Sequence, residues 1–201
     1  MLTVLLIATP SVAGRVSGQS ALTGRYYLVV WGLQGPDNDV VDSHTFVSFY
    51  RGDDLDKGIV KPATISWLPA TGVVQVFGSE KGHNFTVAQT LKMACRSGRQ
   101  VKSWGPYEIE PALYRRALKR IRLLNSGRVQ YSMIDASPGT MNCIDAAGDL
   151  IPQPIDTGIA WGFVASDAVV RHLSPYFKRG GSPVEALADV LIPKACSGHR
   201  Q

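Results

Sequence analysis

The spacing of apolar residues changes near residue 85, and this change restricts the folds open to the chain. Before it, β-branched and aromatic residues form short runs, and residues within Val40 to Tyr50 alternate with a period of two. After it, apolar residues recur with the spacing of amphipathic helices. A period of two is typical of strands, and a period near 3.6 is typical of helices. Strands first, then helices alternating with fewer strands, predict an α+β domain with helices packed on a mainly antiparallel sheet.

The predicted elements follow from these patterns and from the Gly, Pro and Asn residues between them. Strands are expected at 26–33, 40–50, 64–68, 73–77, 101–107 and 129–134. Helices are expected at 85–96, 110–124, from about 142, at 166–173 and at 183–191. The first helix is predicted to bury Phe85, Ala88, Leu91 and Cys95, and the second Leu113, Ala117, Ile121 and Leu124.

The first fourteen residues carry no charge, and an apolar run from Leu2 to Ala8 is followed by small residues. This pattern resembles a secretory signal peptide, although no Lys or Arg precedes the apolar run. The alternatives are a start further upstream and a first β-strand of the core. We therefore expect residues 1–21 to be a leader and residues 25–201 to form a single domain. The predicted location is secreted, periplasmic or in the cell envelope.

The composition argues against several classes of function. Hydrophobic residues make up 45% of the 201 residues and charged residues 18%, which is typical of a globular chain. The net charge is +5, but no nucleic-acid motif accompanies it, so no nucleic-acid partner is expected. Beyond the leader no stretch reaches the ~18 apolar residues of a spanning helix, so no transmembrane segment is expected in the mature form. No nucleotide-binding or zinc-protease motif occurs, so neither cofactor nor metal is predicted. The oligomeric state stays open.

The three cysteines are Cys95, Cys143 and Cys196, an odd number that leaves one thiol over if two of them pair. We predict a disulfide between Cys95 and Cys196, because it would tie down the C-terminal segment. Cys143 would then carry a free thiol. The alternative is a protein of a reducing compartment, in which all three thiols stay reduced.

Cys143 is the candidate nucleophile because of its position after a turn and directly after Asn142. Thr140 or Asn142 can serve as an N-cap, so a helix is expected to begin near Asn142. A helix N-terminus carries a partial positive charge and free N–H groups. These features predict a lowered thiol pKa and a backbone oxyanion hole. The alternative is a buried structural cysteine.

His44 is the candidate general base because it lies within a predicted strand, which is a rigid support for a catalytic side chain. The alternative is a half-buried strand histidine without a chemical role.

An early strand histidine, followed far downstream by an Asn142-Cys143 pair that opens a helix, resembles the circularly permuted branch of the NlpC/P60 papain-like superfamily. That branch includes lecithin-retinol-acyltransferase-like proteins, whose nucleophile often lies in an Asn-Cys-Glu-His sequence. Only the Asn-Cys pair matches, because Ile144 and Asp145 follow here. The resemblance covers roughly residues 40–150. It implies a papain-like fold in permuted order, with Cys143 as nucleophile and His44 as general base. It also implies a further polar residue that orients the imidazole ring, and Ser66 on the next strand and His83 in the following Gly-rich loop are both candidates.

We therefore predict a secreted thiol hydrolase, of the peptidase or amidase kind, or an acyltransferase that acts on an amide or ester bond. Its substrate would be a peptide, a cell-wall fragment or a lipid acyl group. Asn142, Trp104 and Tyr107 are candidates for substrate binding, although aromatic residues at a Gly-Pro turn also serve as core residues. The alternative function is that of an exported binding or structural protein with the same fold and no catalysis.

Overall fold

The structure is a computed structural model that describes residues 22–134 and 137–194. The predicted leader at residues 1–21 and the Cys196 half of the predicted disulfide lie outside these residues, so both stay predictions. Cys143 carries a free thiol. No helix in the part of the chain that the structure describes is long and apolar enough to cross a membrane.

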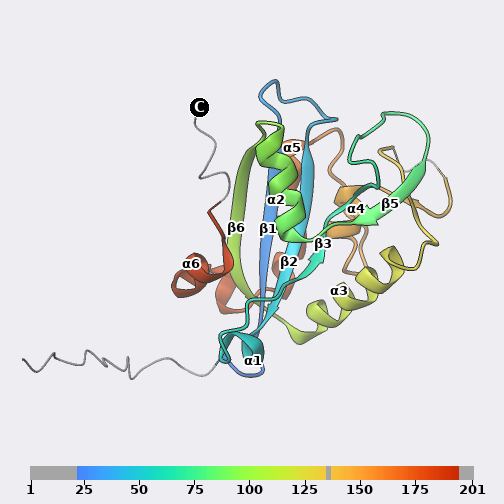
Figure 1. The fold of residues 1–201 in the computed structure, drawn as a ribbon. Helices are drawn as coiled ribbons and strands as arrows, with labels where there is room; N and C mark the ends of the chain where they lie inside the picture. Colours follow the sequence, from blue (N-terminus) through green and yellow to red (C-terminus); the bar gives the residue numbers. More distant parts are fainter. Residues whose placement is uncertain (1–21, 135–136, 195–201) are drawn as a thin grey trace, which may run out of the picture.

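A four-stranded antiparallel sheet forms the centre of the fold (Figure 1). Its strand order is β3 (Ala63–Ile65), β2 (His44–Arg51), β1 (Tyr26–Gln34) and β6 (Gln100–Ile109). All the residues of β1 between its two ends are buried. A strand that is covered on both faces reads as a continuous apolar run, whereas a half-exposed strand alternates. This explains why residues 26–33 lack the alternation expected of a surface strand.

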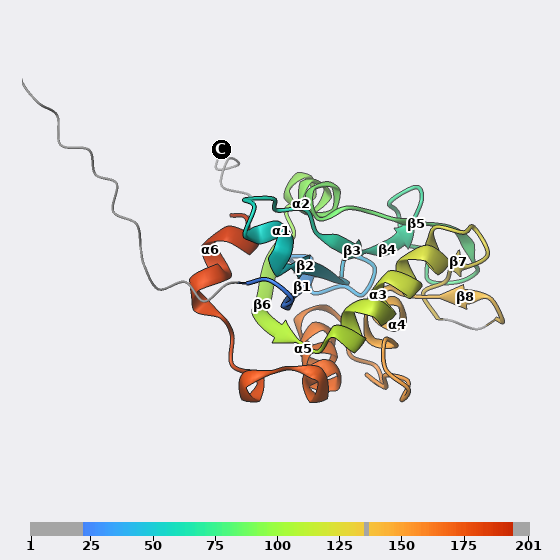
Figure 2. The ribbon, with the colours of Figure 1, turned by 90° about the horizontal axis from the view of Figure 1, so that it is seen from below.

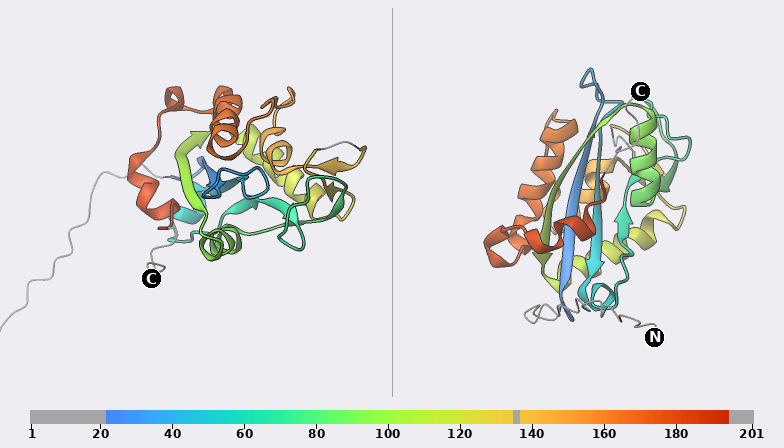
Figure 3. Two further views of the ribbon diagram at one scale, coloured as in Figure 1. Left: turned by 90° about the horizontal axis from the view of Figure 1, so that it is seen from above. Right: turned by 60° about the vertical axis from the view of Figure 1, so that its left-hand side comes forward.

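The two faces of this sheet have separate hydrophobic cores, because helices cover both faces (Figures 2 and 3). The face with α2 (Val87–Arg96) and α6 (Ala188–Leu191) receives Tyr27, Val29, Trp31 and Leu33 from β1. The opposite face, with α3 (Pro111–Leu124), α4 (Cys143–Gly148) and α5 (Gly162–Leu173), receives Leu28 and Val30. Successive side chains of a strand point to opposite faces, so β1 supplies both cores at once.

A smaller sheet lies beside the central one, in the strand order β4 (Trp67–Pro69), β5 (Glu80–Asn84), β7 (Gln130–Tyr131) and β8 (Thr140–Met141). Its pairs are antiparallel except β7 with β8. Ser66 is the single residue between β3 and β4, where the chain passes from one sheet to the other. The Trp67 indole N–H donates to the Met141 carbonyl at 3.0 Å. This bond fixes the chain just before α4 against the smaller sheet.

Arg120 on α3 fixes the other end of α4. Its guanidinium donates to the carbonyl oxygens of Asp145 and Asp149, at the C-terminal end of that short helix. A cation at a helix C-terminus satisfies unpaired carbonyls and complements the helix dipole. Because both ends of α4 are held, the position of Cys143 at its first turn is determined by tertiary contacts.

The predicted α+β architecture is confirmed, and the remaining elements are short. They are α1 (Gly52–Leu55) and 3-10 turns at Ser174–Tyr176, Arg179–Gly181 and Glu185–Leu187. The predicted buried face of α3 is confirmed at Leu113, Ala117 and Leu124, while Ile121 is half-buried.

Several predicted elements differ from the structure. The segment Val73–Phe77 is a loop, and its side chains at Val73 and Phe77 are exposed because the described residues offer it no neighbouring strand. The strand predicted at 129–134 has only two paired residues, and the helix predicted at 183–191 is reduced to a 3-10 turn at Glu185–Leu187 followed by the four residues of α6. In these segments apolar content did not indicate regular hydrogen bonding, and several of the apolar side chains are exposed.

The buried face of α2 also differs from the prediction. It consists of Val87, Thr90, Leu91 and Ala94, whereas the predicted Ala88 is exposed and Cys95 is only half-buried. The helix begins at Thr86, whose side chain forms a reciprocal capping box with Gln89. This start places Thr90 inward although it is polar.

The contact between β1 and α5 gives a direct test of the fold. A Cβ atom on Gly32 would lie 2.6 Å from the Ser166 hydroxyl oxygen and 3.0 Å from Phe163. We expect Gly32→Ala to lower the free energy of unfolding by about 1–3 kcal/mol, as overpacking in a core does. Urea unfolding measures this loss. In a Ser166→Ala background the same substitution is expected to cost less, because the nearest atom is gone. An equal loss in both backgrounds would contradict this packing.

Candidate functional site

Cys143 occupies the first position of α4, as the sequence predicted. The side-chain oxygen of Asn142 accepts hydrogen bonds from the N–H groups of Ile144 (2.8 Å) and Asp145 (2.9 Å). Asn142 is therefore an N-cap, and it explains why the helix begins here. Its oxygen is already used in capping, so of its side-chain groups only the amide NH₂ is left for the substrate contact that was predicted.

His44 is the first residue of β2, and its side chain is 1% exposed. The ring stacks on Phe46, with 5.6 Å between the ring centroids. Strand β3 pairs only with Val47, Ser48 and Phe49, so the edge of β2 beside its first three residues is open. The N-terminal end of α4 lies at this open edge.

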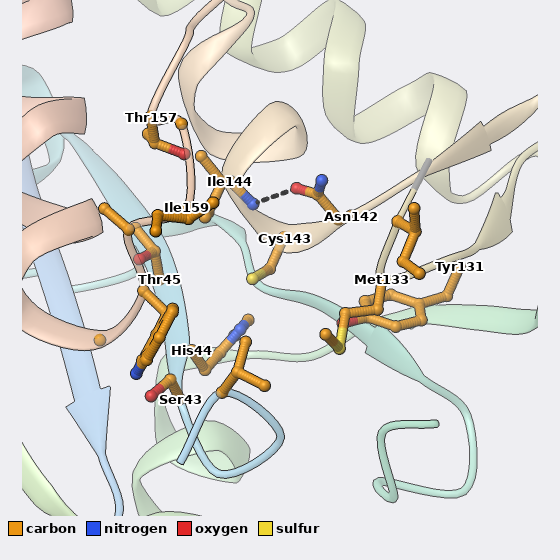
Figure 4. Close-up of a pocket in the computed structure, with 16 residues that line it drawn as sticks. Ser43, His44, Thr45, Tyr131, Met133, Asn142, Cys143, Ile144, Thr157 and Ile159 are labelled. Carbon is orange, nitrogen blue, oxygen red and sulfur yellow. Dashed lines mark hydrogen bonds between the residues drawn. The ribbon is translucent and has the colours of Figure 1, made fainter. Parts of the chain in front are cut away.

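One pocket of about 510 Å³ brings the two predicted residues together. In Figure 4 the sulfur of Cys143 and the ring of His44 point toward one another from two sides of this pocket. The other lining residues come mostly from the loops before β2, after β7 and before α5. They are Val40, Ser43, Thr45, Tyr131, Met133, Ile134, Asn142, Ile144, Thr157, Gly158, Ile159, Ala160, Trp161 and Gly162.

The thiol of Cys143 is protonated in this environment. Burial raises the pKa of Cys143 to about 11, although the backbone N–H groups of Thr45, Cys143 and Ile144 favour the thiolate. The sequence prediction of a lowered pKa is therefore wrong. The helix N-terminus contributes in the predicted direction, but removing the sulfur from water has the larger effect.

A chain of hydrogen-bonded hydroxyl groups holds the Nε2 side of the His44 ring. Its Nε2 atom lies 2.9 Å from the Ser66 hydroxyl, which lies 2.7 Å from the Thr90 hydroxyl. The Thr90 hydroxyl donates to the Thr86 carbonyl at 2.9 Å. Ser66 therefore occupies the orienting position that the sequence left open between Ser66 and His83. The other ring nitrogen, Nδ1, is buried and has no hydrogen-bond partner among residues 22–134 and 137–194.

The imidazole of His44 is neutral. Burial, and secondly the positive charge of Arg99, lower the pKa of His44 to about 3. Arg99 in turn forms an ion pair with Asp42, at 2.7 Å. With the thiol protonated and the ring neutral, the two groups do not form a thiolate–imidazolium pair in the resting protein.

Three predicted site residues lie elsewhere. His83 is exposed on β5, where its ring meets Phe85 edge-on, so it does not orient His44. Trp104 on β6 is half-buried against Phe163, and Tyr107 is buried and stacked on Phe177. None of the three lines the pocket. The predicted substrate contacts of Trp104 and Tyr107 are replaced by packing contacts, the alternative that the sequence left open.

Sequence reasoning missed several residues that the structure brings to the site. Thr90 and the N–H of Thr45 reach it through tertiary contacts, and Met133, Ile159 and Trp161 reach it on loops. The one local signal was a Thr inside the predicted helix 85–96, flanked by apolar positions. A polar residue on a buried helix face requires a hydrogen-bond partner.

Metal binding finds no support in the ranges 22–134 and 137–194, where no group of three or more His, Cys, Asp or Glu side chains could hold an ion.

No protein-family model, no curated protein and no solved structure matches the chain. The geometry of the pocket is therefore the basis for a proposed function.

The neutral, buried state of His44 makes stability depend on pH. Its pKa is about 3 in the folded protein and ordinarily 6.5, so its contribution is complete above pH 6.5 and is lost as the pH falls toward 3. The slope reaches about 1.4 kcal/mol per pH unit for one group. We expect His44→Gln to remove this component from urea unfolding curves measured between pH 4 and pH 7. His83→Gln, on an exposed strand, is the control and should leave the slope unchanged. Equal slopes for the wild type and His44→Gln would contradict the assignment.

Proposed function

We propose that the protein is a cysteine-dependent hydrolase or acyltransferase that acts on an amide or ester bond. One observation carries the proposal: the thiol of Cys143 and the ring of His44 line one pocket, and the buried Nδ1 of that ring has no described partner. Buried polar atoms are almost always paired, and an unpaired one at a pocket marks a candidate for chemistry.

The proposed reaction begins with the neutral pair. The Cys143 proton passes to Nδ1 of His44 as the sulfur attacks the carbonyl carbon, forming a C–S bond and a tetrahedral oxyanion. The imidazolium then returns the proton to the leaving amine or alkoxide, and the C–N or C–O bond breaks. Water or an acceptor alcohol or amine next attacks the thioester through His44, which restores the thiol. No redox partner is needed at any step.

The energy of the first step fits this order of events. The two pKa values differ by 11 − 3 = 8 units. At about 1.4 kcal/mol per unit, complete proton transfer before attack costs on the order of 10 kcal/mol, less the attraction between the two charges formed. A turnover of ~10 per second corresponds to a barrier of about 16 kcal/mol. Complete proton transfer before attack would take up a large share of that barrier, which favours transfer within the attack step, with His44 as a general base.

The lining of the pocket favours an uncharged, apolar acyl group. None of its described lining residues is Asp, Glu, Lys or Arg, and half of them carry an aliphatic, aromatic or thioether side chain. Ile159, Ile134 and Trp161 stand at the pocket with exposed fractions of 89%, 52% and 37%. Burial of a charged cell-wall peptide here would leave its charges unpaired, which is costly. A fatty-acyl ester fits the same surface.

The order of the site along the chain supports the same proposal. The histidine is on strand β2, the nucleophile begins helix α4 far downstream, and a polar residue holds the second ring nitrogen. This is the order that the resemblance to permuted papain-like enzymes implies. A serine hydroxyl in the orienting position and a helix of only six residues are features of this chain.

The neutral state of the pair favours one other candidate, an apolar-ligand-binding protein of the same fold. A thiol with a raised pKa reacts slowly, and the pocket alone is sufficient for binding. The two candidates differ in one measurable respect: only the enzyme forms a covalent thioester at Cys143.

We expect the protein to release p-nitrophenol from p-nitrophenyl octanoate and to carry one octanoyl group on Cys143 in rapidly quenched samples. Intact-mass and peptide-mass spectrometry detect the adduct. Cys143→Ala should abolish both signals, and His44→Gln should slow acylation by about 10²–10⁴-fold, the usual contribution of a general base. His83→Gln is the matched control and should react like the wild type. Undiminished turnover in Cys143→Ala would exclude this nucleophile. Octanoate binding without an adduct would contradict the enzyme and support the candidate function of an apolar-ligand-binding protein.

The preference for apolar acyl groups has a separate test. Met133→Glu places a carboxylate in the pocket lining, so we expect kcat/KM for the octanoyl ester to fall at least tenfold, with a smaller loss for the acetyl ester. Each methylene buried contributes about 0.8 kcal/mol, which makes the longer chain the more sensitive one. Val190→Glu, on the exposed side of α6 and outside the pocket, is the control. Equal losses for both esters would contradict an apolar acyl site.

A further inference from the structure

The hydroxyl chain behind His44 has one bond whose direction is fixed. A carbonyl oxygen can only accept, so the Thr90 hydroxyl must donate its single proton to Thr86. Such a bond back to the carbonyl four residues earlier is common for Thr in helices. With its proton used, the Thr90 oxygen can only accept from Ser66, 2.7 Å away. The direction of the whole chain follows from this bond.

The direction of these hydrogen bonds also determines which imidazole nitrogen of His44 carries the proton. Ser66 donates to Thr90, so its oxygen is left as an acceptor for His44, 2.9 Å away. A neutral imidazole carries one N–H, and here that proton must lie on Nε2. Nδ1 consequently has a free lone pair, and His44 and Cys143 line the same pocket. The opposite direction would lose the bond to the Thr86 carbonyl and leave a buried N–H at Nδ1 without a described partner.

The two hydroxyl groups of this chain are held in place. Thr90 and Ser66 are both 0% exposed. Thr90 lies in the first turns of α2, behind the capping box of Thr86. The backbone of Ser66 is held by Asn84, whose side-chain oxygen accepts from the Ser66 N–H at 2.8 Å while its NH₂ donates to the Thr64 carbonyl at 2.8 Å. Neither hydroxyl can reach water to reverse its role.

We propose that Thr90 is a positioning residue that fixes the tautomer of His44, keeping the proton on Nε2 and the lone pair of Nδ1 available to the Cys143 thiol. Thr90 touches neither the thiol nor the pocket and acts only through Ser66. The tautomer assignment stands on the hydrogen bonds alone, whereas its effect on reaction rate rests on the proposed function.

Substitution of Thr90 by the isosteric valine removes the acceptor that holds the Ser66 proton. Ser66 can then donate to Nε2, and the imidazole proton moves to Nδ1, facing the thiol. Thr90→Ser keeps a hydroxyl at the same place and should keep the wild-type direction. Ser66→Ala takes away both donor and acceptor, so both tautomers should be populated.

Long-range ¹H–¹⁵N correlation spectra of the full chain distinguish the two tautomers, and His44→Gln identifies the signals of His44. We expect Nε2–H in the wild type and in Thr90→Ser, a shift to Nδ1–H in Thr90→Val, and a mixture in Ser66→Ala. A pure Nε2–H form in folded Thr90→Val would overturn the proposal, as would a pure Nε2–H form in Ser66→Ala if the valine variant fails to fold.

Acylation of Cys143 by p-nitrophenyl octanoate gives the second readout. We expect at least a tenfold slower rate in Thr90→Val and recovery in Thr90→Ser. If the tautomer changes as expected but no variant, including the wild type, forms a thioester, the proposed function fails and the role of Thr90 in fixing the tautomer stands. If the wild type acylates and Thr90→Val acylates equally fast with a changed tautomer, Thr90 has no part in the reaction and the positioning role is overturned.

Discussion

The open edge of β2 is the constraint on which the site depends. Strand β3 is too short to pair with the first residues of β2, and a buried N–H without a partner is costly. The N–H of Thr45 meets this requirement by facing the sulfur of Cys143. The same contact therefore gives the N–H of Thr45 a partner at the sheet edge and places the thiol beside His44. The N-cap of Asn142 and the contacts of Arg120 hold α4 where this can happen.

The same arrangement explains why the site is uncharged at rest. The two side chains approach each other between the cores on either side of the sheet, where neither is well hydrated. Desolvation acts on both groups toward the neutral form, raising the thiol pKa and lowering that of His44. The hydrogen bonds of the site are consequently between neutral groups. Which group donates and which accepts therefore determines the state of His44.

The sequence was informative where function depends on local features. Asn142 before Cys143 predicted a capped helix start, and the alternation around His44 predicted a strand, because caps and periodicity are properties of neighbouring residues. It could not select Ser66 over His83, or find Thr90, because these contacts join residues about 20 or more positions apart. It also gave the wrong direction for the thiol pKa, since burial is decided by the loops before β2 and α5. The apolar segment 73–77 was assigned to a strand because β-propensity carries no information about a pairing partner.

The half-buried, protonated state of Cys143 has a consequence for redox chemistry. Thiol–disulfide exchange and oxidation by peroxide both proceed through the thiolate, so a thiol with a pKa of about 11 reacts with either only slowly. The unpaired cysteine can therefore persist beside oxidants that would join or oxidise an exposed thiol. Desolvation, which slows the attack on a substrate, also keeps the sulfur in the reduced form that such an attack requires.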